Sequence, residues 1–270
     1  MIPAEKISED IWKKASPSQA ENLKRFFKTE AGQYGEGDRF AGVKVPEVRE
    51  IVKHHKGGAT LEDVELLTRS TYHEERLAGL FLLIELYKRT KKGGDVKELG
   101  NLVDYYLKIS PRCNNWDLVD LSAPKILGDY ISDNPERESM LMQLSSSNNL
   151  WKQRISIVAT LPLIKKNNFD LPLDIIFSLK NHPHDLIQKA TGWMLREIGK
   201  KNRETLKIFL DRHCTQLQPT TLRYAIEHFD SETREYYRQR RKAGTRVSIP
   251  QSEGKQIPMS HRLTISKKKK

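Results

Sequence analysis

"YHEERLAGLFLLIELYKRT", residues 72–90, is the stretch that decides the fold class. Its apolar residues recur at helical spacing, and in the centre of the stretch they extend almost all the way round the helix. A helix that is apolar on nearly every side has to be covered by other elements, so we expect this one to lie in the interior. No convincing alternating strand pattern occurs along the chain, and we therefore predict an all-α protein.

Similar helical periodicity continues on both sides of this stretch. "SPSQAENLKRFF", residues 16–27, predicts a helix with Ser16 as its N-cap and Pro17 in its first turn, and "VPEVREIVKHH", residues 45–55, predicts another that starts at Pro46. Further helices are expected at about 95–109, 116–131, 136–145, 149–166, 171–180, 184–200, 203–213, 218–229 and 231–241. The glycine-rich segment 29–40 is expected to be a mobile connection.

Five of these helices begin alike, because each carries a charged residue just before an apolar stripe at the same helical phase. The charged residues follow one another at roughly 34 to 44 positions, with a shorter helix between them, which is a length typical of two-helix repeats. This pattern predicts an α-α superhelix, a solenoid of HEAT-like helical repeats. In such a stack the marked residues form one column on the concave face: Arg76, Asp120, Arg154, Lys189 and Arg223.

The charge of the chain favours nucleic acid as a partner. The net charge is +12 over 270 residues, but residues 242–270 hold eight basic residues against one acid, so the body carries only the remaining +5. A concave column with four cations suits a DNA duplex, whose phosphates can lie opposite them. The alternative is a solvated edge of unrelated charges.

Composition also suggests the organisation and the compartment. We expect one domain over residues 1–241 and a basic, disordered tail over 242–270. Two widely separated cysteines, Cys113 and Cys214, indicate neither a disulfide framework nor a zinc site. No apolar run is long enough to span a membrane and no signal region is present, so we expect a cytoplasmic protein, nucleoid-associated if bacterial, and a monomer.

One acid in the basic column has an unusual setting. Trp116 lies four residues before Asp120, so both project from the same face of a helix. Trp151 and Trp193 lie on neighbouring helices of the repeat. A carboxylate among cations and indoles could stabilise the oxocarbenium character that develops on a sugar when an N-glycosidic bond breaks. The alternatives are core packing for the tryptophans and a structural ion pair between Asp120 and Arg154.

Metals and nucleotide cofactors have little support. His54 and His55, like His182 and His184, have no cysteine or carboxylate at ligand spacing beside them. Neither a phosphate-binding loop nor a dinucleotide fingerprint occurs. We therefore expect no metal and no cofactor.

At these positions the chain resembles a known family. "GVKVPEVRE" (42–50), "NWDLVD" (115–120), "LWKQR" (150–154) and "IQKATGWMLRE" (187–197) are similar, in this order and spacing, to motifs of the AlkD-type DNA alkylation repair glycosylases. The resemblance runs from about residue 18 to 240. Two places depart from the pattern, since Asn115 and the pair Asp185 and Leu186 stand where some members have aromatic residues.

The resemblance implies HEAT-like repeats and a DNA glycosylase that excises N3- and N7-alkylated purines from duplex DNA in base excision repair, without metal or cofactor. It places the catalytic aspartate at Asp120, the sugar-contacting tryptophans at Trp116 and Trp193, and a phosphate-binding arginine at Arg154. We expect further backbone contacts from Lys189, Arg76, Arg223 and Trp151. The competing hypothesis is a noncatalytic helical-repeat module that binds DNA or a protein partner, because fold alone does not establish activity.

Overall fold

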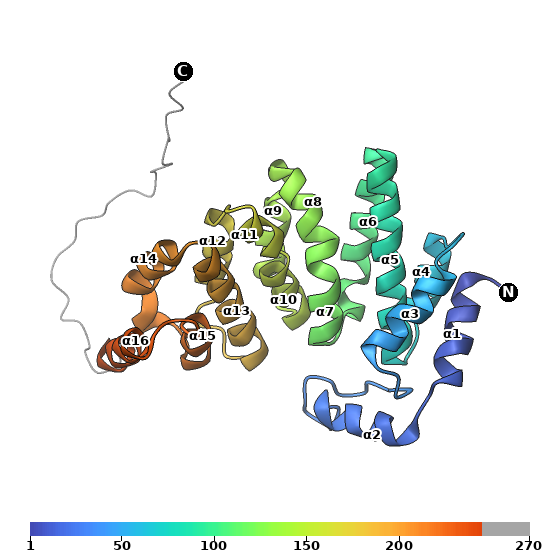
Figure 1. Cartoon of the computed structure of the whole chain (residues 1–270), viewed down its shortest axis with the longest axis horizontal. Coiled ribbons are helices and arrows are strands. Elements are labelled where there is room, and N and C mark those ends of the chain that lie inside the picture. The colour runs from blue at the N-terminus through green and yellow to red at the C-terminus, as the bar shows by residue number, and fades with distance from the viewer. Residues whose placement is uncertain (245–270) are drawn as a thin grey trace.

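The computed structural model describes residues 1–244, which form a row of helices stacked from the N-terminus to the C-terminus (Figure 1). Within these residues no strand occurs, and a single isolated bridge joins Arg39 to Tyr72. The prediction of an all-α chain built as a helical solenoid is confirmed.

Two layers of helices make up the row. The inner layer is formed by helices that each contact the next: α3, α5, α7 with α8, α10 with α11, α13 and α15. Most of the others pack behind or at the ends of this layer, whereas α2 lies below the row (Figure 1). The α-helices are α1 (Pro3–Lys13), α2 (Pro17–Phe26), α3 (Val45–His55), α4 (Leu61–Thr68), α5 (His73–Gly93), α6 (Val96–Ile109), α7 (Trp116–Ser122), α8 (Leu127–Asp133), α9 (Ser139–Ser145), α10 (Leu150–Val158), α11 (Leu161–Lys165), α12 (Asp170–Ser178), α13 (Asp185–Lys201), α14 (Arg203–His213), α15 (Pro219–Ala225) and α16 (Ser231–Gly244). Short 3-10 turns η1 (Ser110–Arg112), η2 (Ala123–Lys125), η3 (Pro135–Arg137) and η4 (Cys214–Gln216) connect some of them.

The long helix predicted from residues 72–90 is α5, and it is buried as expected. Its side chains from Leu77 to Ile84 are all buried, and so are Leu86 and Tyr87. They belong to one continuous apolar cluster that extends from α1 to α16. Burial of this many apolar groups is the main term that stabilises the solenoid.

Two helices that the pattern predicts as continuous are interrupted. The predicted helix 116–131 is divided by η2, which contains Pro124, and the predicted helix 149–166 is divided before α11, which has Pro162 in its first turn. Proline has no backbone N–H and clashes with the preceding turn of a helix, so it ends or kinks the helix there.

Two helices were not predicted from the sequence. In α1, Ala4, Ile7 and Ile11 are buried at spacings of three and four, which is the signature of an amphipathic helix. The short helix α4 packs against α5. Both lie at the N-terminal end, where they close the solenoid.

Glycine allows two close approaches within the inner layer. A Cβ added to Gly128 of α8 would lie 2.3 Å from the carbonyl oxygen of Ala159, and one added to Gly192 of α13 would lie 2.6 Å from that of Thr221. Neighbouring backbones therefore touch at these points. The second contact fixes α15 beside Trp193.

The segment between α2 and α3 is held by buried charge. Ser16 caps α2 as predicted, and its hydroxyl accepts a hydrogen bond from the amide of Gln19 at 3.4 Å. The carboxylate of Glu74 in α5 accepts hydrogen bonds from the backbone amides of residues 41, 42 and 43 at 2.8 to 3.2 Å. A negative charge that binds several backbone N–H groups holds a loop firmly. Residues 29–40, expected to be a mobile connection, are thus anchored at their C-terminal end.

The basic tail expected over 242–270 lies, from residue 245 onward, outside the described residues. In residues 1–244, no helix has the length and apolar character needed to cross a membrane.

Candidate functional site

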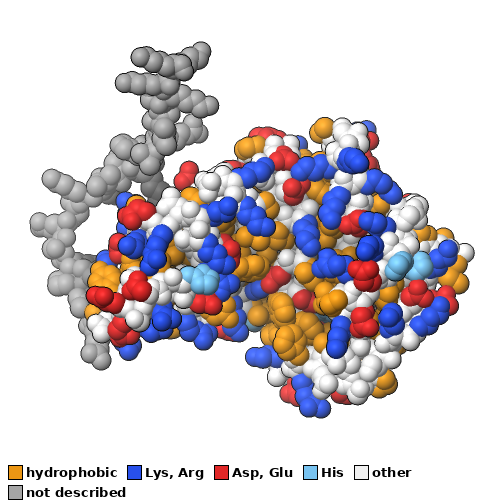
Figure 2. All heavy atoms as spheres, in the orientation of Figure 1, with side chains coloured by type: hydrophobic (Ala, Val, Ile, Leu, Met, Phe, Trp, Pro, Cys, Tyr) orange, Lys and Arg blue, Asp and Glu red, His pale blue; other side chains and the backbone are white. Residues whose placement is uncertain are grey.

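An open cleft lies where the inner layer meets the segment around α2. We call it the aromatic cleft, because five aromatic side chains line it together with four cations and one acid. Figure 2 shows hydrophobic side chains gathered at the hollow between the α2 region and the helices α13 and α15. Its lining residues are Phe26, Lys28, Tyr34, Trp116, Arg154, Asp185, Leu186, Lys189, Trp193, Arg196 and Tyr224.

Trp116 is the first residue of α7, and its indole is held from the α2 side. The Asn115 side chain caps this helix by accepting a hydrogen bond from the Trp116 amide at 2.9 Å. The indole lies 5.9 Å from the ring of Phe26 and 5.5 Å from that of Phe27. These spacings are typical of packed aromatic pairs. Phe26 is 61% exposed, so one wall of the cleft is an aromatic face open to solvent.

Tyr34 also lines the aromatic cleft. Burial raises the pKa of Tyr34 above its ordinary value, so the phenol stays protonated at neutral pH. It therefore offers a neutral polar group at the wall of the cleft.

Asp120 lies one helical turn after Trp116 and is bound at both oxygens by Arg154. The Nε of Arg154 donates to Oδ1 at 2.9 Å, and its Nη2 donates to Oδ2 at 2.8 Å. A third guanidinium nitrogen, Nη1, donates to the carbonyl oxygen of Leu186 at 2.5 Å. The paired geometry fixes the direction of the carboxylate. The Asp120 side chain is 18% exposed and that of Arg154 is 6% exposed.

Burial raises the pKa of Asp120 above its ordinary value, while the Arg154 guanidinium opposes that shift. Arg154 therefore favours the charged form of a largely buried acid. A carboxylate that is oriented and only partly hydrated interacts strongly with any positive charge brought near it, because little water screens the attraction.

Asp120 does not itself line the aromatic cleft. It lines a neighbouring hollow, which we call the basic hollow because five lysines surround it. Arg154 lines the aromatic cleft and its partner Asp120 lines the basic hollow. The basic hollow is lined by Tyr87, Lys88, Lys91, Lys92, Asp120, Pro124, Lys125, Asp129, Leu161, Pro162 and Lys165.

Trp193 is the second tryptophan in the lining of the aromatic cleft. Its indole Nε1 donates to Glu197 at 3.2 Å, one turn later in α13, and this bond orients the ring. On the same helix Lys189 pairs with Asp185 at 2.6 Å. Four sequence-predicted residues thus line one cleft, namely Trp116, Arg154, Lys189 and Trp193. Asp120 is joined to them through its ion pair with Arg154.

Three other predicted contact residues are placed elsewhere. Trp151 is buried and Arg76 is buried in an ion pair with Asp38, so neither presents its side chain to the cleft. Arg223 is exposed, with its guanidinium 5.4 Å from the ring centroid of Tyr224, but it is not among the residues that line the cleft. The repeat spacing therefore identifies the helices correctly, but the charged side chains at the repeated positions do not all face the same surface.

A buried charge network behind Trp116 was not predicted. His73 lies between two carboxylates, with Nδ1 3.0 Å from Asp38 and Nε2 2.8 Å from Asp117, and Arg76 also binds Asp38. Burial alone would lower the pKa of His73, but the carboxylates of Asp117 and Asp38 raise it to about 9. The imidazole is therefore charged at neutral pH. His73 therefore links α5 to Asp38 in the loop before α3 and to Asp117, the residue after Trp116.

Several cleft residues were also missed, namely Phe26, Tyr34 and Tyr224. Tyr34 comes from the glycine-rich stretch, where no helical period occurs, and Phe26 ends the helix just before it. The high density of aromatic residues between 26 and 40 is the one signal that could have drawn attention to them.

Two of the histidines considered as metal ligands, His182 and His184, make local hydrogen bonds. His184 caps α13, since its Nδ1 accepts from the amide of Leu186 at 3.1 Å, and His182 accepts from the amide of His184 at the same distance. Across the described part of the chain, no group of three or more His, Cys, Asp or Glu side chains could hold a metal ion.

Comparison with known proteins adds to this geometry. A solved structure from Enterococcus faecalis, described as a predicted DNA alkylation repair enzyme, is 20% identical and superposes with a TM-score of 0.63 over 80% of this chain and 97% of that one, which shows a shared fold. No curated protein matches. The family model described as DNA alkylation repair enzyme matches residues 7–229, which is most of the chain. The chain therefore belongs to the DNA alkylation repair enzyme family.

Proposed function

We propose that this protein is a DNA glycosylase that excises N3- and N7-alkylated purines, such as 3-methyladenine and 7-methylguanine, from duplex DNA in base excision repair. The observation that carries the proposal is that Arg154, which holds Asp120 in an ion pair, lines the same open cleft as Trp116 and Trp193. Membership of the DNA alkylation repair family supplies the substrate class.

The proposed reaction breaks the bond between the sugar C1′ and the purine nitrogen. The bonding electrons leave with the base, which carried a positive charge from alkylation and departs neutral, so no separate general acid is required. The sugar becomes an oxocarbenium ion, and the Asp120 carboxylate stabilises that charge. Water adds to C1′ and loses a proton, which Asp120 or solvent accepts.

The indoles of Trp116 and Trp193 are proposed to flank the deoxyribose. Electron-rich ring faces attract a cationic nucleoside, and a desolvated contact of this kind contributes about 2 kcal/mol. The nearby cations of the cleft, Lys28 and Lys189, are proposed to contact phosphates. Because Arg154 already uses three of its nitrogens in bonds to Asp120 and Leu186, we assign it first to positioning Asp120 and second to phosphate binding.

The test is release of methylated purines from duplex DNA treated with a methylating agent. Wild-type protein is expected to release base, and Asp120→Asn, which keeps the size of the side chain and removes its charge, is expected to lose most of the rate. Undamaged duplex serves as the control substrate. Equal release by the two proteins would contradict the proposal.

A second candidate function is noncatalytic DNA binding by the helical-repeat surface. The observation that favours it is that both carboxylate oxygens of Asp120 are occupied by Arg154, as in a purely structural pair. It predicts salt-sensitive duplex binding that is indifferent to alkylation and survives Asp120→Asn.

A further inference from the structure

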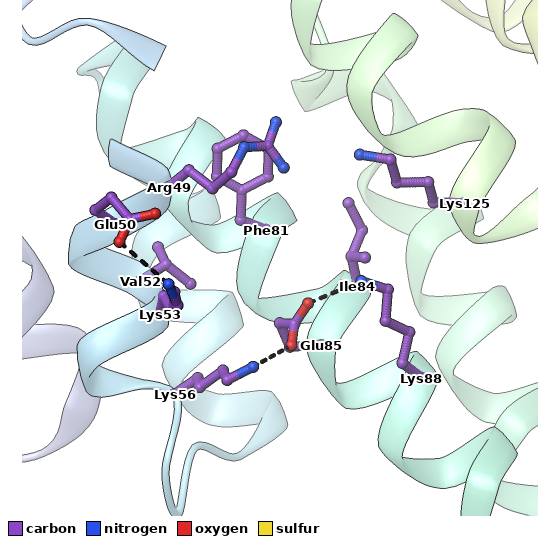
Figure 3. Close-up of a pocket in the computed structure, with 10 residues that line it drawn as sticks. All are labelled: Arg49, Glu50, Val52, Lys53, Lys56, Phe81, Ile84, Glu85, Lys88 and Lys125. Carbon is purple, nitrogen blue, oxygen red and sulfur yellow. Dashed lines mark hydrogen bonds and ion pairs between the residues drawn. The ribbon is translucent and has the colours of Figure 1, made fainter. Parts of the chain in front are cut away.

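A second group of cations lies outside the aromatic cleft, in a pocket between α3, α5 and η2. We call it the α3–α5 pocket. Figure 3 shows Arg49 and Lys125 pointing into it from opposite sides, over Phe81 and Ile84. The pocket is lined by Arg49, Glu50, Val52, Lys53, Lys56, Phe81, Ile84, Glu85, Lys88 and Lys125.

Positive charge in this pocket exceeds the negative charge that faces it. Five cations line it against two acids, Glu50 and Glu85. Glu85 is shared by Lys56 at 2.6 Å and Lys88 at 3.0 Å, and Glu50 binds Lys53 at 3.4 Å. The two acids are thus already engaged with three lysines.

The remaining two cations lack an acidic partner. In residues 1–244, neither Arg49 nor Lys125 forms an ion pair, and the Arg49 guanidinium lies 4.3 Å from the ring centroid of Phe81. The contact with the ring holds the guanidinium beside Phe81, and because Arg49 is exposed its N–H groups can reach an acceptor.

The surroundings of Lys125 disfavour its positive charge. It is half-buried, and burial together with the charges of Arg49 and Lys88 lowers the pKa of Lys125 below its ordinary value. A bound anion would relieve both effects, because it replaces lost hydration and offsets the repulsion between cations.

The α3–α5 pocket adjoins the basic hollow beside Asp120, because Lys88 and Lys125 line both. A path of positive charge therefore leads from Asp120 past η2 to Arg49 on α3. The inner layer carries this path, and Figure 2 shows Lys and Arg side chains over the corresponding face.

We propose that the α3–α5 pocket binds a backbone phosphodiester of the DNA strand, with Arg49 and Lys125 as its two ligands. This inference rests on DNA being the substrate class of the proposed function. A planar guanidinium with a fixed N–H edge and a lysine ammonium are the groups that recognise phosphate oxygens best in proteins. The contact would lie away from the sugar that reacts, and it would set the register of the duplex without reading its sequence.

The test is binding of the full chain to an undamaged duplex over a series of salt concentrations, so that it does not depend on base release. The double variant Arg49→Gln with Lys125→Gln is expected to bind about tenfold more weakly at low salt, which is the loss of one charge-assisted contact. The slope of log K against log salt is expected to shrink by about 0.9, the value for one phosphate released.

The matched control removes the same charge from the outer layer. Lys97 and Lys108 are exposed on α6, and their double glutamine variant is expected to bind as wild type does. Thermal unfolding of each variant checks that the fold is kept. Wild-type affinity and slope in the Arg49 and Lys125 variant, or an equal loss in the α6 control, would overturn the proposal.

A second experiment measures binding of inorganic phosphate to the wild type and to the double variant. If the wild type bound phosphate saturably, the double variant lost that binding, and duplex affinity stayed unchanged, the pocket would belong to a small free anion and the proposal would be wrong. Loss of base release by Asp120→Asn bears on the proposed reaction and leaves this result untouched.

Discussion

Raising the pH from 6.5 to 9 is expected to destabilise the protein through one buried side chain, His73. Its ring is held between Asp38 and Asp117, and these carboxylates raise its pKa from the ordinary 6.5 to about 9. Between those values the folded protein binds one more proton than the unfolded chain does. Stability therefore falls as pH rises, by about 1.4 kcal/mol per pH unit.

The full effect over this range is about 3 kcal/mol, because the two pKa values differ by about 2.5 units. The contribution is complete below pH 6.5 and is lost as pH rises through about 9. Such a loss is a large fraction of the free energy of unfolding of an ordinary domain, which is about 5 to 15 kcal/mol.

Urea unfolding at several pH values between 6 and 9.5 measures this dependence, and NMR of the histidine rings measures the pKa directly. His73→Gln is expected to be less stable at pH 6.5 and to lose the slope, while the control His54→Gln, at an exposed position, keeps it. A His73 titration midpoint at or below 6.5, or a wild-type stability as flat as that of His73→Gln, would refute the reasoning.

Three further predictions concern the site and its supports. Arg154→Ala is expected to raise the pH below which base release is lost, because the Arg154 guanidinium lowers the pKa of Asp120 in the wild type. A profile of kcat/KM against pH that falls at the same acidic pH in both proteins would contradict this. Trp193→Ala is expected to slow base release about 10- to 30-fold with a smaller effect on binding of undamaged duplex, measured by single-turnover kinetics and titration, whereas equal losses in both would point to a purely structural role. Gly192→Ala is expected to destabilise by about 1 to 3 kcal/mol in urea unfolding because its new Cβ would collide with the Thr221 carbonyl, while Gly93→Ala, which meets nothing within 4 Å, stays close to wild type.

The periodicity of the sequence predicts the fold class well because helices in a solenoid contact their neighbours at regular intervals. The apolar centre of α5 and the cap at Ser16 both report on local structure, and both are observed. Periodicity does not show where a proline interrupts a helix that is otherwise apolar, as at Pro124 and Pro162. The short helices α1 and α4 were missed for lack of a repeat partner.

The site was predictable in part. Trp116 and Asp120 share a face because they are four residues apart in one helix, which is a property of local geometry. The partner of Asp120 comes from the next repeat, and the sequence left open whether Arg154 binds the acid or a phosphate. Arg76 could not be assigned, because its burial depends on Asp38 in a loop with no periodic signal. Contacts of that kind depend on tertiary packing alone.

The most direct test of the proposed role of Asp120 is the rate at which methylated purines leave duplex DNA with wild-type protein and with Asp120→Asn under identical conditions. We expect release by the wild type and a loss of most of that rate in the variant, with both proteins binding undamaged duplex. Release at the same rate by both proteins, or by neither while both bind DNA, would contradict it.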